Sequence, residues 1–186
     1  MMYAEEWDGK QDPAGWCMTE DLDGFRAFWD GTHLYSKNGN IFPIPLEFTE
    51  GLPRDVCLDG ILWVGSSALH KLSSICRKTS RLLHDNYQNA IDLWRNVNFS
   101  VYDAPMVDGY YLDRYSFAKN SISKCQSNIQ MIPTECCLGW NHLQTKLHQI
   151  KHHSGKGMIL YHPSSLYTPG RTTNILKVNT DRAENN

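Results

Sequence analysis

Short apolar runs separated by turn signals dominate the first third of the chain. The runs cover residues 15–18, 24–29, 34–36 and 58–64. Asp30-Gly31 and Asn38-Gly39 stand beside them, and such pairs favour tight hairpin turns because glycine and asparagine tolerate a positive φ. Runs of this length bounded by turns are typical of β-strands. The pattern therefore predicts antiparallel strands in this part of the chain.

The spacing of apolar residues becomes helical over residues 68–83, where Leu69, Leu72, Ile75 and Leu82 fall on one face. Further helices are expected over 85–94 and 139–150, and further strands over 99–103, 158–161 and 174–178. Strands and helices do not alternate regularly along the chain. We therefore expect one α+β domain over residues 1–179, followed by a polar, frayed tail over 180–186.

Composition mainly excludes classes of protein. Hydrophobic residues make up 41% of the chain, which is enough for a core, and a net charge of −2 gives no overall attraction to nucleic acid. No leader-like segment is visible, and no apolar run approaches the ~18 residues of a bilayer-spanning helix. Six cysteines without disulfide-type spacing indicate free thiols. The sequence thus predicts an intracellular protein that does not span a membrane.

A set of short motifs runs along the chain in a fixed order. The first, within residues 16–31, contains Thr19-Glu20-Asp21-Leu22-Asp23-Gly24-Phe25-Arg26-Ala27. The others occupy residues 36–40, 58–63, 101–105, 155–160, 167–171 and 176–178. Together these motifs resemble those of the adenylation (nucleotidyltransferase) domain of small ATP-dependent DNA ligases, over roughly residues 7–179.

The resemblance implies an α+β fold of antiparallel sheets flanked by helices, with a central nucleotide cleft. It also implies the family's reaction, in which a lysine amine attacks the α-phosphate of ATP with Mg²⁺ as cofactor. AMP then passes to the 5′-phosphate of a nick in duplex DNA. Nick sealing in repair and recombination, and a nuclear location, follow only from this resemblance. Family ligases continue into an OB-fold domain, whereas this chain ends nine residues after Lys177 (186 − 177), so we expect an adenylation domain without that clamp.

The chain departs from the family pattern at three charged positions of the site, and also at Tyr161 and Asn179, which stand in place of basic residues. Asp21 stands in place of the nucleophilic lysine, and Ile61 and Lys156 stand in place of two carboxylates. A carboxylate repels a neighbouring phosphate by about 1 kcal/mol per pair of charges at 4 Å in water. The sequence therefore predicts that the chain does not adenylate itself. Because positions 21 and 156 exchange sign, we also expect Asp21 and Lys156 to form a partly buried pair. A relocated nucleophile at Lys156 is the less favoured alternative, because in-line attack tolerates little displacement.

The resemblance maps five nucleotide-binding candidates onto this chain, with Asp21 at the catalytic position. The candidates are Glu20, Arg26, Tyr102, Lys156 and Lys177. Tyr102 matches the aromatic residue that stacks on adenine in the family, and a core aromatic of a strand is an equal alternative. No metal ligand is predicted, because the cysteines and histidines lack zinc-type spacing.

A basic set, Lys71, Arg77, Lys78 and Arg81, lies on one predicted helix. Contacts to a DNA backbone come mainly from such residues, although a solvated helix face is the more common explanation. Three functional hypotheses follow: a ligase-type domain that has lost its activity, a non-catalytic regulator that binds nucleotide or DNA, and a chain that folds without a selected role. The expected partners are ATP or AMP and nicked duplex DNA.

Overall fold

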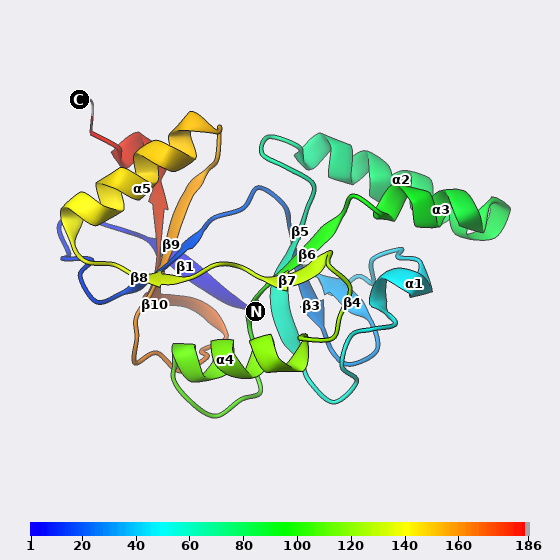
Figure 1. Cartoon of the computed structure of the whole chain (residues 1–186), viewed down its shortest axis with the longest axis horizontal. Helices are drawn as coiled ribbons and strands as arrows, with labels where there is room; N and C mark the ends of the chain where they lie inside the picture. Colours follow the sequence, from blue (N-terminus) through cyan, green and yellow to red (C-terminus); the bar gives the residue numbers. More distant parts are fainter. Residues whose placement is uncertain (185–186) are drawn as a thin grey trace.

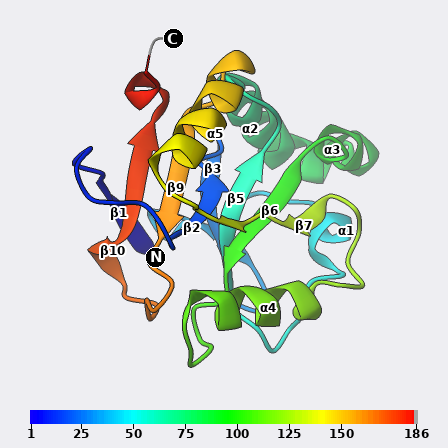
Figure 2. The same ribbon diagram turned by 60° about the vertical axis from the view of Figure 1, so that its left-hand side comes forward.

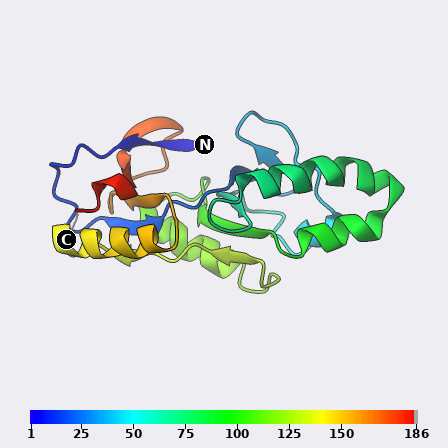
Figure 3. The same ribbon diagram turned by 90° about the horizontal axis from the view of Figure 1, so that it is seen from above.

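Two five-stranded sheets, A and B, build two lobes that lie side by side (Figure 1). The computed structural model describes residues 1–184. The α+β fold predicted from the sequence is confirmed, with helices on the outer sides of both sheets. Figure 3 shows helices α2 and α3 next to each other at one end of the molecule and helix α5 at the other end.

Sheet A has the strand order β1-β10-β9-β2-β8. Its strands are β1 (Met2–Glu6), β10 (Gly170–Asn179), β9 (Gly157–Tyr161), β2 (Cys17–Glu20) and β8 (Glu135–Cys136). Helix α5 (Trp140–His152) covers one face, where Leu143 and Leu147 pack in a cluster with Met18 and Leu160. Successive residues of a strand point to opposite faces, so the neighbours of these residues in β2 and β9 point away from α5.

Sheet B has the strand order β4-β3-β5-β6-β7. Its strands are β4 (Leu34–Ser36), β3 (Phe25–Trp29), β5 (Leu58–Trp63), β6 (Asn98–Asp103) and β7 (Ile129–Met131). Three helices contribute buried residues to the core of this sheet: α1 (Leu46–Thr49), α2 (Leu69–Asp85) and α3 (Tyr87–Trp94). Trp94 of α3 connects the three helices. The centroid of its ring lies 5.1 Å from that of Phe48 in α1, and its Nε1 donates to Thr79 Oγ1 of α2 at 2.8 Å.

Helix α4 (Tyr111–Ser121) runs below both lobes and joins their cores (Figure 2). Tyr111 packs with residues of sheet A, and Ala118 packs in the core of sheet B. Between them, Arg114 is fully buried, and its Nε donates to Asp103 Oδ1 at 2.7 Å. Its Nη1 also donates to the carbonyl oxygen of Ser165 at 2.6 Å. Arg114 therefore ties α4 to sheet B through Asp103 and to the loop before β10 of sheet A through Ser165.

The structure corrects three expectations about secondary structure. The sheets are not purely antiparallel, because β1 pairs with β10 and β6 pairs with β7 in parallel. Strands β1, β7 and β8 and helices α1 and α4 were not predicted. Between residues 180 and 184 the chain is not frayed, because Thr180–Arg182 form a 3₁₀ helix and the Gln144 side chain bonds to the backbone of Arg182 and Glu184. The last two residues of the predicted tail, 185 and 186, lie outside the described residues.

Within residues 1–184, no helix combines the length and the apolar character needed to cross a membrane.

Candidate functional site

A cavity of about 400 Å³ lies where the two sheets meet. Apolar and aromatic residues of both sheets and of the connection between β2 and β3 form part of its wall: Leu22, Ile61, Tyr102, Ile159, Tyr161 and Ile175. Charged residues form another part: Glu6, Asp21, Arg26, Lys37, Lys156, Arg171 and Lys177. A cavity of this size and mixed lining is typical of sites for small ligands. The structure thus brings together Asp21 and four of the five predicted nucleotide-binding residues.

Asp21 lies directly after β2, on the sheet A side of this cavity. Its backbone N–H donates to the Gly157 carbonyl at 2.8 Å, which fixes the residue against the start of β9. The side chain is only 8% exposed. Its Oδ1 lies 3.8 Å from Lys156 Nζ and its Oδ2 lies 3.7 Å from Lys177 Nζ. The predicted pair of Asp21 and Lys156 is present, and Lys177 is an additional partner.

Burial raises the pKa of Asp21 above its ordinary value, and the two lysines only partly oppose this shift. The reason lies in the geometry: both N–O separations are too long for a hydrogen bond, and Oδ2 is buried without a hydrogen-bond partner. The carboxylate therefore depends on the charges of Lys156 and Lys177 for its compensation.

Arg26 lines the cavity from β3, but its guanidinium is already engaged. Nη2 donates to Asp59 Oδ2 at 2.7 Å and Oδ1 at 2.9 Å, and both Nη atoms donate to the Met2 carbonyl at 3.2 Å. The Tyr167 hydroxyl donates to Asp59 Oδ2 at 2.7 Å and accepts from the Met2 amide at 3.1 Å. Arg26 and Asp59 thus connect sheet B to β1 and to the loop before β10. A contact of Arg26 with nucleotide stays a prediction.

Tyr102 is a core aromatic that also reaches the cavity, and its stacking on adenine stays a prediction. It is buried in a cluster with Leu22, Ile61 and Ile132, and it also forms part of the cavity wall. Its hydroxyl donates to the Glu20 carbonyl at 3.2 Å, which holds the ring in place between β6 and β2. The ring is thus an ordered, flat surface at the edge of the cavity.

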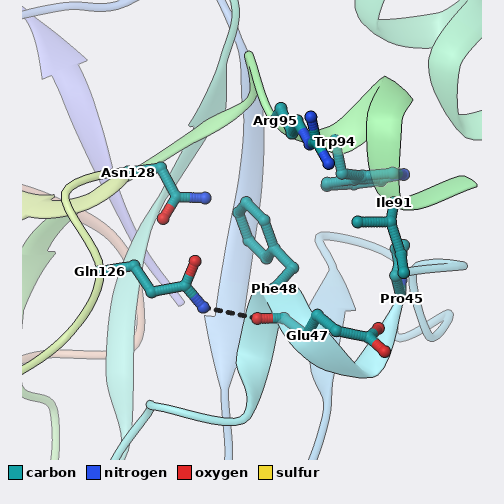
Figure 4. A pocket seen from close by; sticks show the side chains of 8 residues that line it. All are labelled: Pro45, Glu47, Phe48, Ile91, Trp94, Arg95, Gln126 and Asn128. Carbon is teal, nitrogen blue, oxygen red and sulfur yellow. Dashed lines mark hydrogen bonds between the residues drawn. The ribbon is translucent and has the colours of Figure 1, made fainter. Parts of the chain in front are cut away.

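A second hollow lies between α1 and α3, beside Phe48 and Trp94 (Figure 4). Its volume is about 60 Å³, and Gln126 closes one side by donating to the Glu47 carbonyl. This space holds no more than a few waters, so it is not a second candidate for a nucleotide.

Comparison with known proteins finds similarity to DNA ligases, both in sequence and in structure. No protein-family model matches the sequence. A DNA ligase from Haemophilus influenzae is 26% identical over 174 residues, which are 91% of this chain and 60% of that protein. A structure from a structure–function analysis of Lig E DNA ligases superposes with a TM-score of 0.84 at 26% identity, covering 96% of this chain and 68% of that one. The chain is homologous to the nucleotidyltransferase domain of ATP-dependent DNA ligases. The ATP complex of the bacteriophage T7 ligase shares the fold, with a TM-score of 0.65 at 13% identity over 96% of this chain and 68% of that one.

The structure does not place the Glu20 side chain in the cavity of this ligase-type domain. Glu20 is the last residue of β2, so its side chain points to the α5 face while that of Asp21 points to the cavity. Its Oε1 lies 3.0 Å from His153 Nε2. Glu20 is connected to the site through its carbonyl, which accepts the bond from the Tyr102 hydroxyl.

Several residues of the site are not among the nucleotide-binding candidates predicted from the sequence. Lys37 and Arg171 line the cavity, and both lie within the motifs that carry the family resemblance. Tyr3 and Glu6 enter from β1, where the sequence contains no comparable signal. The parallel pairing of β1 with β10 is what carries these residues to the site.

The cavity does not fit the Mg²⁺ ion that the family implies. Mg²⁺ prefers carboxylates and water, but Asp21 and Glu6 are the acidic residues of the lining, and Asp21 faces two lysines. Ile61 contributes an apolar side chain to the lining. Across residues 1–184, no group of three or more histidine, cysteine or acidic side chains is placed to hold a metal ion.

We expect Lys156→Glu to lower the free energy of unfolding by about 1 kcal/mol. The variant would place a second carboxylate beside buried Asp21 and remove one of its two compensating charges. The effect is limited because the Lys156 side chain is 43% exposed, so water screens the interaction. Urea denaturation would measure it, with exposed Lys151→Glu on α5 as the matched control. Equal stability of the two variants would show that the pair contributes nothing.

Proposed function

We propose that this ligase-type domain binds an adenine nucleotide in its cavity without becoming adenylated. The observation that carries the proposal is the position of Asp21 between Lys156 and Lys177, where the family has its nucleophilic lysine. The homologous DNA ligases support a nucleotide pocket at this place. The chain spans only 60% of the Haemophilus ligase, so the activity of the complete ligases is not carried over.

The chemistry of a carboxylate explains the expected inactivity. Self-adenylation needs a lone pair that attacks the α-phosphate and a product stable enough to pass AMP to DNA. Attack by Asp21 would form a mixed anhydride, which hydrolyses readily, in place of a phosphoramide. A carboxylate at this position also repels the phosphate. The cavity therefore supports binding better than group transfer.

The test is incubation of the protein with Mg²⁺ and α-³²P-labelled ATP, followed by denaturation and detection of label on the chain. We expect no label and no sealing of nicked DNA, while equilibrium dialysis detects bound nucleotide. Stable label would overturn the proposal, and mass spectrometry would then show whether Lys156 had become the nucleophile. Absence of any nucleotide binding would also overturn the proposal, because the cavity would then not be a nucleotide site.

Asp21→Lys alone is not expected to restore labelling. The new ammonium group would lie next to Lys156 and Lys177 without the carboxylate that separates them, and Ile61 would still leave the pocket short of an acid. The triple variant Asp21→Lys, Ile61→Glu, Lys156→Glu restores the family pattern at all three positions and serves as the comparison. The labelling assay above measures both variants. Labelling of the single variant at the level of the triple variant would contradict this expectation.

A second candidate function, binding to a DNA backbone, is favoured by one observation on α2. Lys71, Arg77, Lys78 and Arg81 are all exposed, and none has an acidic partner within 4 Å in the part of the chain that the structure describes. Unpaired cations of this kind neutralise phosphates and release counterions.

The test of this candidate is fluorescence anisotropy with nicked duplex DNA at several salt concentrations. Replacing the four residues by alanine should weaken binding and reduce the salt slope by about 0.9 for each phosphate that the variant no longer neutralises. The control is the double variant Lys119→Ala, Lys124→Ala, whose two positions are exposed and lie on α4 and just after it. An unchanged salt slope in the four-residue variant would mean that the cations of α2 do not contact DNA and form only a solvated helix face.

A further inference from the structure

The cavity offers an apolar slot between the two sheets. Ile61 and Tyr102 come from sheet B, and Ile159 comes from sheet A, with Leu22 in the connection between them. The Tyr102 ring is fixed at its hydroxyl by the Glu20 carbonyl. Flat, uncharged rings such as nucleobases bind in slots of this kind, because they bury apolar surface and stack on aromatic side chains.

The charged end of the same cavity is already neutralised from within. Lys156 and Lys177 approach opposite oxygens of Asp21, at 3.8 Å and 3.7 Å. A phosphate that bound between these lysines would have to displace the carboxylate or lie beside it. Asp21 cannot move away freely, because its side chain is buried and its amide is bonded to Gly157.

The other cations of the lining add little attraction for phosphate. Arg26 is bonded to Asp59 at 2.7 Å, and Arg171 lies 3.9 Å from Glu5. Lys37 has no acidic partner within 4 Å among residues 1–184, but it is exposed and therefore screened by water. Since these cations are paired or screened, the apolar slot is the part of the cavity from which a ligand would gain binding free energy.

We propose that this cavity recognises the nucleoside part of its ligand and gains no affinity from phosphate, because Asp21 already supplies the anion that Lys156 and Lys177 would bind. This inference rests on the proposed nucleotide pocket and names its ligand class: an uncharged purine nucleoside binds as well as its phosphates do. Asp21 is then the residue that sets the specificity of the pocket.

The experiment compares adenosine with AMP by isothermal titration calorimetry on the wild-type chain and on Asp21→Asn. In the wild type we expect dissociation constants for the two ligands within about threefold of each other. In Asp21→Asn the amide keeps the shape but removes the charge, so AMP should bind at least about fivefold more tightly than adenosine, as one charge pair at 4 Å in water predicts. Asp23→Asn is the matched control, since Asp23 lies two residues away and does not line the cavity.

Salt dependence in the wild type tests the same point without a variant. If phosphate makes no net ionic contact, the dissociation constants of adenosine and AMP should change equally between low and high NaCl. A wild-type preference for AMP of more than about threefold, or an Asp21→Asn variant that prefers AMP by less than about fivefold, would overturn the inference and leave the nucleotide pocket standing. Failure of both ligands to bind either protein would instead refute the pocket itself, and the inference with it.

Discussion

Replacing Asp103 with alanine is expected to lower the free energy of unfolding by about 3–5 kcal/mol, the usual cost of breaking a buried ion pair from one side. Arg114 is fully buried, and it loses two bonds to the carboxylate in this variant, of 2.7 Å and 3.1 Å. Its remaining bonds go to the carbonyls of Ser165 and Gly109, which cannot neutralise a charge. The guanidinium is therefore left uncompensated in the interior.

Urea denaturation followed by tryptophan fluorescence would measure this loss. Exposed Asp108→Ala, in the loop just before α4, is the matched control and should stay within about 0.5 kcal/mol of the wild type. A double variant, Asp103→Leu with Arg114→Met, should recover much of the stability because it removes both charges together. A loss below about 1 kcal/mol for Asp103→Ala would mean that water or another anion reaches Arg114.

The Arg114 pair also shows why part of the fold was not predictable. Helix α4 buries Tyr111, Arg114 and Ala118, a face whose middle residue is charged, so no apolar stripe identifies the helix. Its burial depends on Asp103, which lies on another element, and on carbonyls of two loops. Such compensation is tertiary and leaves no periodic trace in the sequence.

Helices α2 and α5 contrast with α4, because their apolar residues recur at helical spacing and they were predicted close to their observed bounds. The strands that carry the motifs were recognised for a similar reason, since β3 and β5 combine short apolar runs with adjacent turn residues.

The sequence predicted the features of the site that depend on the type of residue. It did not predict those that depend on which strands are neighbours or on the direction in which a side chain points. The reversed charges at Asp21 and Lys156 predicted their pairing. The motif at 176–178 predicted that Lys177 belongs to the same site, but its pairing with Asp21 was not predicted, because it depends on β10 lying next to β9 in sheet A. Glu20 illustrates the limit most clearly: it adjoins Asp21 in sequence, yet the alternation of β2 sends its side chain to His153 on the other face.

The second large effect is expected for Asp59→Asn, which should lower the free energy of unfolding by about 2 kcal/mol. The amide preserves the size of the carboxylate but removes the charge that faces Arg26, and one of its two terminal atoms becomes a donor that cannot accept from Arg26 or Tyr167. Asp59 is 2% exposed, while the Arg26 side chain is 27% exposed. Water therefore compensates Arg26 in part, and the loss should be smaller than for Asp103→Ala.

The same substitution should loosen β1 specifically. Arg26 and Tyr167 are held by Asp59, and they in turn bond the carbonyl and the amide of Met2. Amide hydrogen exchange should therefore accelerate in β1 before it does so in β2 or β9. Exposed Asp55→Asn, in the loop before β5, is the matched control and should leave both stability and exchange unchanged. If β1 keeps its protection in Asp59→Asn, its backbone pairing with β10 alone suffices to hold it over the cavity, and the network of Arg26, Asp59 and Tyr167 has another role.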